Sequence, residues 1–154
     1  MLKAFMAVAC VALALQSAEA KESSAGLNIK SPKDALALIS QDSFGSISLQ
    51  KLIADITGNA VYRERTNYST GYVEVVSQNT VGHFGSVDFG FKPPYDFGQE
   101  DVLALATRIP GAKVSTEHSI VIVSWTSNQF KCNVMFHAST QTSFFDYLCD
   151  YRGD

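Results

Sequence analysis

The sequence has little cysteine, little proline and no excess of positive charge. Its 154 residues include three cysteines, four prolines and one tryptophan, and 15 acidic residues outnumber 12 basic ones, for a net charge of −3. A general polyanion binder would carry a basic patch, so this balance excludes that class and leaves room for a local positive site. There is also no phosphate-binding loop, no nucleophile elbow and no cluster of metal ligands, so we expect no cofactor and no metal.

Long apolar runs are absent as well, except for one near the N-terminus. Residues 5–15 form an unbroken apolar run after Lys3, and Ala18-Glu19-Ala20 has the small residues that signal peptidase accepts. The run is too short to span a bilayer, so residues 1–20 are predicted to be a cleaved signal peptide. We therefore expect a secreted protein with no membrane segment after cleavage, and the remaining length suits one domain.

Cleavage of the signal peptide would leave two cysteines, Cys132 and Cys149. An even pair in an exported chain predicts a disulfide. The loop it closes has 16 intervening residues, and cross-linking a loop of that size stabilises a fold by about 3 kcal/mol. Two free buried thiols are the alternative.

The order of predicted elements indicates a single α+β domain over residues 31–154, after a flexible N-terminus at 21–30. Ser31-Pro32 begins a short helix that extends to Ile39, and a second helix follows Ser48 and ends at Gly58. A third helix is expected over 100–109. The predicted strands cover residues 61–68, 72–76, 87–91, 120–125 and 132–136, with residues 144–149 as either strand or helix.

The C-terminal third carries the most informative pattern. An apolar strand at 120–123 is followed by a turn at Asn128, a second apolar strand ending in His137, a polar loop, and an aromatic segment ending in Cys149. This order resembles the fungal guanyl-specific ribonuclease and ribotoxin superfamily, and most closely its RNase-like secreted effectors. The resemblance implies an antiparallel twisted sheet packed against one main amphipathic helix, here residues 48–57, with an extra N-terminal helix.

The same resemblance implies an arrangement of site residues. His137 would be the catalytic acid, and Asp96, in a Pro-aromatic-acid-aromatic turn, would be the carboxylate that removes the ribose 2′-OH proton. His83 would substitute for the second histidine of the family, with His118 as the next choice. The arginine that the family uses falls at Val121, and losing such a stabilising group costs about 10²- to 10³-fold in rate.

Contacts to RNA would come from Arg63, Arg65 and Tyr72, by charge and by stacking. Each of these residue assignments has a structural alternative. Asp96 is also an ordinary turn residue, His137 an edge or core histidine, and the arginines with Tyr72 an exposed strand face.

Three functional hypotheses follow. The first is a monomeric secreted RNase-like effector, catalytically impaired, that is delivered to a host and binds a host protein or RNA; it places Asp96 and His137 in one cleft without a basic partner. The second is an active secreted guanyl-preferring endoribonuclease, which requires Arg63, Arg65 or another cation close to His137. The third is an unrelated exported inhibitor or immunity-type binding protein, with Asp96 and His137 on different faces.

Overall fold

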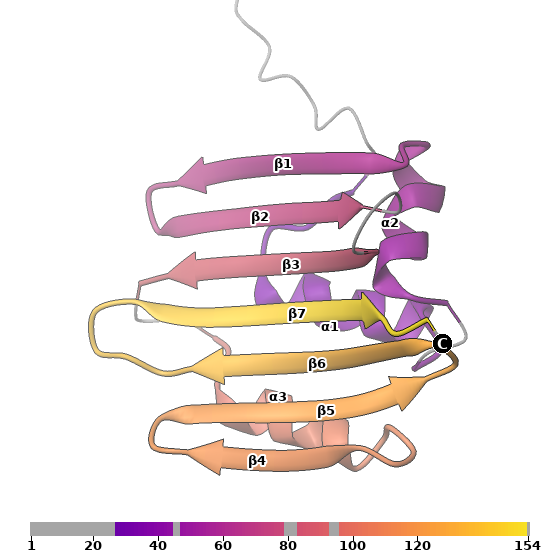
Figure 1. Cartoon of the computed structure of the whole chain (residues 1–154). Coiled ribbons are helices and arrows are strands. Elements are labelled where there is room, and N and C mark those ends of the chain that lie inside the picture. The colour runs from indigo at the N-terminus through magenta and orange to yellow at the C-terminus, as the bar shows by residue number, and fades with distance from the viewer. Residues whose placement is uncertain (1–26, 45–46, 79–82, 93–95, 154) are drawn as a thin grey trace, which may run out of the picture.

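A computed structural model describes residues 27–44, 47–78, 83–92 and 96–153, and the predicted signal peptide lies outside them. These residues form a seven-stranded antiparallel sheet with three helices on one side of it, as Figure 1 shows. The α+β class is therefore confirmed. The sheet is larger than the fold we expected, because it is built from two strand meanders and backed by more than one main helix.

The helices are α1 (Pro32–Gln41), α2 (Leu49–Thr57) and α3 (Gln99–Ala106). The strands are β1 (Val61–Tyr68), β2 (Gly71–Gln78), β3 (Phe84–Phe91), β4 (Lys113–Glu117), β5 (Ile120–Ser127), β6 (Phe130–His137) and β7 (Ser143–Tyr151). Their order across the sheet is β1-β2-β3-β7-β6-β5-β4, so β1–β3 and β4–β7 are two meanders joined where β3 pairs with β7.

Local signals place the first two helices where the sequence predicts them. The hydroxyl of Ser31 accepts a hydrogen bond from the backbone N–H of Asp34 at 3.2 Å, and Pro32 occupies the first turn of α1. Ser48 caps α2 in the same way, through the N–H of Lys51 at 3.1 Å. Gly58 ends α2 in the left-handed region at φ 71°, a conformation that glycine adopts without steric cost.

The hydrophobic core lies between the helices and the face of the sheet that they cover. Alternate residues of each central strand point into it, because side chains along a strand alternate between the two faces. Tyr147 and Phe145 of β7 are the largest of the fully buried side chains. The strand residues of the core are Val73, Val75, Val87, Phe89, Phe91, Val121, Val123, Trp125, Cys132, Val134, Phe136, Phe145, Tyr147 and Cys149.

Two features differ from the sequence prediction. Leu27 and Ile29, in the segment expected to be flexible, are buried in the core. Strand β4 was not predicted, because all five of its residues are exposed and its sequence has no buried alternation. No described helix is long and apolar enough to cross a membrane.

The predicted disulfide is confirmed. Cys132 and Cys149 lie directly opposite each other on β6 and β7 and are bonded, with their Cα atoms 4.1 Å apart. Both residues are fully buried. The bond therefore links the last two strands of the sheet from within the core.

Replacing both cysteines by alanine should lower the free energy of unfolding by about 3 kcal/mol, because the unfolded chain regains the entropy of the loop that the disulfide closes. Urea denaturation of the variant and of the wild-type protein, at one temperature and without reductant, measures the difference. Equal denaturation midpoints and slopes for the two proteins would contradict it.

Candidate functional site on the uncovered face of the sheet

The sheet has one face that no helix of the described chain covers, seen toward the viewer in Figure 1. We call it the uncovered face. The side chains on it alternate with the core residues, so the strand registers fix which residues are neighbours. Its polar, charged and aromatic members are Arg63, Arg65, Asn67, Tyr72, Glu74, Gln78, Phe84, Ser86, Asp88, Lys113, Ser115, Glu117, Ser124, Thr126, Lys131, Asn133, His137, Phe144, Asp146 and Asp150.

Three carboxyl groups form a row across the centre of this face. Glu74 lies opposite Asp88, and Asp88 lies opposite Asp146. Burial and then the charge of Asp146 raise the pKa of Asp88 from 3.8 to about 7. Burial also raises the pKa of Asp146, whose carboxyl group is hydrogen-bonded to that of Asp88. The two groups therefore hold a proton between them near neutral pH, because two adjacent half-buried carboxylates repel each other.

Next to the row of acids, the uncovered face carries a second row made of aromatic rings and one guanidinium group. The guanidinium carbon of Arg65 lies 4.0 Å from the ring centroid of Tyr72, a cation–π contact. The ring of Tyr72 lies against Gly90, where a Cβ atom would come within 2.5 Å of it. On the other side of Gly90 stands Phe144, and the ring of His137 stacks on it with the ring centroids 6.3 Å apart.

An ion pair ties the edge of the face to its acidic centre. Arg63 on β1 approaches Glu74 on β2, with 2.8 Å between a guanidinium nitrogen and a carboxylate oxygen. Arg63 is largely exposed, so the pair contributes at most about 1 kcal/mol to stability. Its effect is to orient Glu74 within the row of acids.

The structure places four of the residues that the sequence singled out on one face, with His137 four strands away from the two arginines. Arg63, Arg65, Tyr72 and His137 all lie on the uncovered face. Asp96 does not join them. Its carboxylate pairs with the ammonium group of Lys33 on α1 at 2.6 Å, on the helical side of the sheet, and this hydrogen bond lowers the pKa of Asp96.

The remaining residues of the expected site also lie apart. His83 precedes β3 and makes an edge contact with the ring of Tyr151, with centroids 5.2 Å apart, at the opposite end of the strands from His137. His118 is exposed in the turn between β4 and β5. Val121 is fully buried in the core. The described residues therefore include no site that combines Asp96, His83 and His137.

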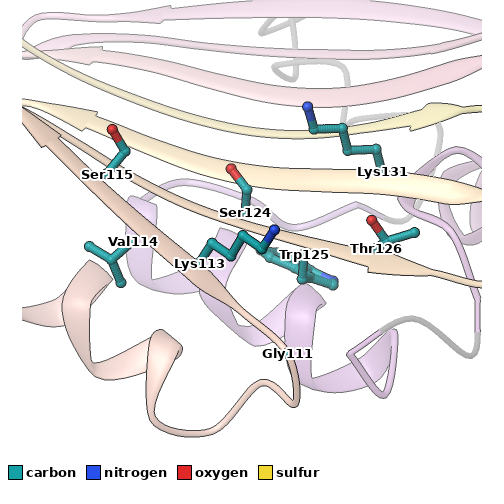
Figure 2. Close-up of a pocket in the computed structure, with 8 residues that line it drawn as sticks. All are labelled: Gly111, Lys113, Val114, Ser115, Ser124, Trp125, Thr126 and Lys131. Carbon is teal, nitrogen blue, oxygen red and sulfur yellow. The ribbon is translucent and has the colours of Figure 1, made fainter.

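A cavity of about 470 Å³ opens at the far end of the same sheet, beside β4 and β5 (Figure 2). Its wall includes Lys113, Trp125 and Lys131. This cavity lies at the edge opposite β1, away from the two arginines.

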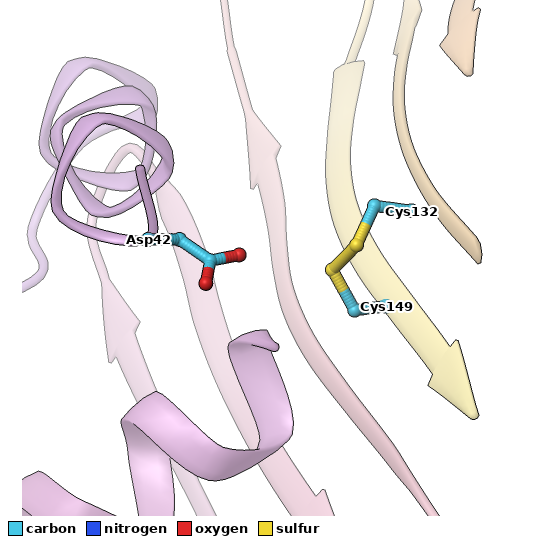
Figure 3. Close-up of side chains that lie close together, drawn as sticks. All are labelled: Asp42, Cys132 and Cys149. Carbon is cyan, nitrogen blue, oxygen red and sulfur yellow. A yellow bond between two sulfur atoms is a disulfide. The ribbon is translucent and has the colours of Figure 1, made fainter. Parts of the chain in front are cut away.

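A buried carboxyl group lies beside the disulfide, as Figure 3 shows. Ligand atoms of Asp42, Cys132 and Cys149 all lie within 4.8 Å of one another. The two sulfur atoms are bonded to each other in the disulfide, so neither is a thiolate that could bind a metal ion. These three residues therefore do not form a metal site. The hydroxyl of Tyr147 donates to Asp42 at 3.1 Å, and burial raises the pKa of Asp42 to about 7.

Sequence reasoning missed the row of acids. Glu74, Asp88 and Asp146 each stand at the polar positions of a strand whose alternate residues are apolar. That alternation shows that each faces away from the core. It does not show that β3 and β7 are neighbours, and only their pairing makes the three carboxyl groups a row.

Comparison of the chain with protein-family models, with curated proteins and with solved structures gives no match. The resemblance to ribonucleases therefore depends on the C-terminal residues from Ile120 to Cys149 and on the turn at Asp96.

The stability of the fold should decrease as pH rises from about 4 to about 7, and Asp88 should account for part of the decrease. The pKa of Asp88 is higher in the folded protein than the ordinary 3.8, so in this range the folded state binds more protons than the unfolded state. The free energy of unfolding of Asp88→Asn minus that of wild type should be about 2 kcal/mol more positive at pH 8 than at pH 5. Urea denaturation at several pH values measures it.

The carboxyl group of Asp42 titrates in the same pH range, but it is present in both wild type and Asp88→Asn. Its effect therefore cancels in the difference between these two proteins. Asp150→Asn is the matched control, since Asp150 is an exposed residue of β7, the strand that carries Asp146 and pairs with β3. If Asp88→Asn and Asp150→Asn show the same pH dependence as wild type, the carboxyl pair does not hold the proton.

Proposed function

We propose that this protein is a secreted RNase-like effector that does not cleave RNA and binds a host protein through the uncovered face. One observation carries the proposal. A face that no described helix covers carries Arg63, Arg65 and Tyr72 on neighbouring strands and His137 further across the sheet. Exposed side chains held in place by their neighbours are preorganised for binding, because little conformational freedom is lost when a partner docks.

The geometry argues against ribonuclease activity. A base and an acid must both reach the same substrate within hydrogen-bonding distance. Asp96 is instead paired with Lys33 on the helical side, whereas His137 stacks on Phe144 on the other face. Arg63 and Arg65 lie on β1, four strands from β6 in the sheet order, which corresponds to roughly 19 Å at the usual strand spacing. Neither arginine can stabilise charge at His137 from there.

The charges favour a protein over RNA as the partner. Glu74, Asp88 and Asp146 occupy the centre of the face. A phosphate backbone laid across the sheet would meet these carboxyl groups, whereas a protein can place basic side chains opposite them. RNA bound by stacking on Tyr72 and Phe144 is the competing outcome.

A second candidate is an unrelated exported inhibitor or immunity-type protein. The separation of Asp96 from His137 supports it, because that hypothesis alone expected the two residues on different faces. The larger sheet supports it as well. Both candidates are binding proteins that use a surface, and they differ in whether the partner belongs to a host or to a neighbouring cell.

Purified mature protein should not cleave single-stranded RNA above the background rate. The measurement is the appearance of 2′,3′-cyclic phosphate ends during incubation at pH 5 to 8. His137→Ala should give the same background. Cleavage by wild type that disappears in His137→Ala would establish the ribonuclease hypothesis instead.

Reversing a charge on the uncovered face should weaken partner binding without unfolding the protein. Arg65→Glu removes the cation–π contact with Tyr72 and adds a negative charge, so affinity for a captured host protein should fall at least tenfold. Lys51→Glu, on the exposed side of α2, is the control. Titration of each variant against the partner measures the affinities, and equal losses in both variants would rule out this face.

A further inference from the structure

The cavity beside β4 arises from unequal strand lengths. The last residue of β5 that pairs with β4 is Ser124, opposite Lys113 at the start of β4. Strand β5 continues through Trp125 and Thr126, while the chain before β4 turns away at Gly111. The space left beside the longer strand is the cavity of about 470 Å³, a volume typical of small-molecule sites.

The wall of this cavity is rich in hydrogen-bond donors. It contains two lysines, three hydroxyl side chains and no acidic residue: Gly111, Lys113, Val114, Ser115, Ser124, Trp125, Thr126 and Lys131. Figure 2 shows Ser115, Ser124 and Thr126 on the same side of the strands as the two ammonium groups. A wall of this kind suits an anionic ligand with several acceptor oxygens.

The strand registers bring these donors close together. Lys113 lies opposite Ser124, and Thr126 lies opposite Lys131. Ser124 and Thr126 are two residues apart on the same face of β5, so neighbouring side chains of the group begin about 5–7 Å apart. Donors at this spacing can converge on one phosphoryl group.

The two lysines are available for a ligand. Neither Lys113 nor Lys131 makes an ion pair with any residue that the structure describes. The nearest acid by register is Asp150, opposite Lys131, and no ion pair joins them. In a chain of net charge −3, two uncompensated ammonium groups at one cavity form a local positive site.

Trp125 also borders the cavity, but its indole lies on the core face of the sheet, because Trp125 is opposite Cys132 and alternates with Ser124 and Thr126 along β5. The residue is 3% exposed, so a ligand held by the lysines and hydroxyl groups would lie over β5, with the indole beneath it on the other side of the strand.

We propose that this cavity binds an organic phosphate monoester. The phosphoryl oxygens accept hydrogen bonds from Lys113, Lys131 and the hydroxyl groups, and the organic part extends along the free edge of β5 beyond the start of β4, beside Gly111. A carboxylate has fewer oxygens and less charge, so it would leave some of these donors unpaired. The site requires no protein partner on the rest of the uncovered face, and its test is independent of the proposed function.

The single tryptophan provides the readout, because Trp125 is part of the cavity wall. Titration of the full secreted protein with adenosine monophosphate at low ionic strength should give a saturable change in tryptophan fluorescence, with the Kd checked by calorimetry. Adenosine and inorganic phosphate should each bind at least tenfold more weakly. Lys113→Gln and Lys131→Gln should each raise the Kd about fivefold, and the double variant should raise it more than either single variant.

Lys51→Gln is the matched control, because Lys51 is an exposed lysine on α2, away from the cavity. Its Kd should equal that of wild type, and circular dichroism should show that all variants are folded. The assignment is overturned if calorimetry and fluorescence show no saturable binding, if adenosine or inorganic phosphate binds as tightly as the monophosphate, or if Lys51→Gln weakens binding as much as Lys113→Gln.

Discussion

The pairing of β3 with β7 is the contact on which the rest of the structure depends. Each meander, β1–β3 and β4–β7, forms from neighbours in the sequence, whereas β3 and β7 are far apart in the chain. Their register sets Val87 against Tyr147 and Phe89 against Phe145 in the core. Without this pairing, neither half-sheet has the complete apolar face that packs against the helices.

The register that aligns apolar side chains in the core brings two acidic side chains together on the uncovered face. The residue between Val87 and Phe89 is Asp88, and the residue between Phe145 and Tyr147 is Asp146, so alignment of the apolar residues forces the two acids together. The folded chain accommodates this repulsion by holding a proton, as the raised pKa of Asp88 shows. The free energy gained by burying apolar side chains on one face therefore offsets the repulsion between the two carboxyl groups on the other face. A shift of one residue in the β3–β7 register would separate these acids, but it would also move the apolar side chains out of the core.

Sequence patterns predict local features such as helix ends, but they miss features that depend on which strands pair. Ser31, Ser48 and Gly58 mark the helix ends through their own backbone hydrogen bonds and φ angles, so short-range patterns suffice. Strand β4 has no apolar side to detect, since it lies at the edge of the sheet. The expected site did not assemble around Asp96 because the chain between β3 and α3 carries this residue to the helical side of the sheet, where it pairs with Lys33, and no local pattern shows the side on which such a connection lies. Four residues chosen for RNA contact and catalysis did reach one face, because strand alternation alone fixes the side on which they lie.

The distribution of charge on the uncovered face constrains what can dock there. Across the strand order, positive charge lies on β1, negative charge on β2, β3 and β7, and positive charge again on β6 and at the start of β4, with Glu117 at the end of β4 as the exception. A partner complementary to the whole face must therefore alternate in sign over the width of the sheet, which a folded protein surface can do and a uniform polyanion cannot. The central negative charge increases when Asp88 loses its proton near pH 7, so complementarity to a basic centre on the partner is greatest above that pH. The cavity beside β4 lies within this outer positive zone, and its nearest wall residue to the acidic row is Lys131 on β6, the strand next to β7.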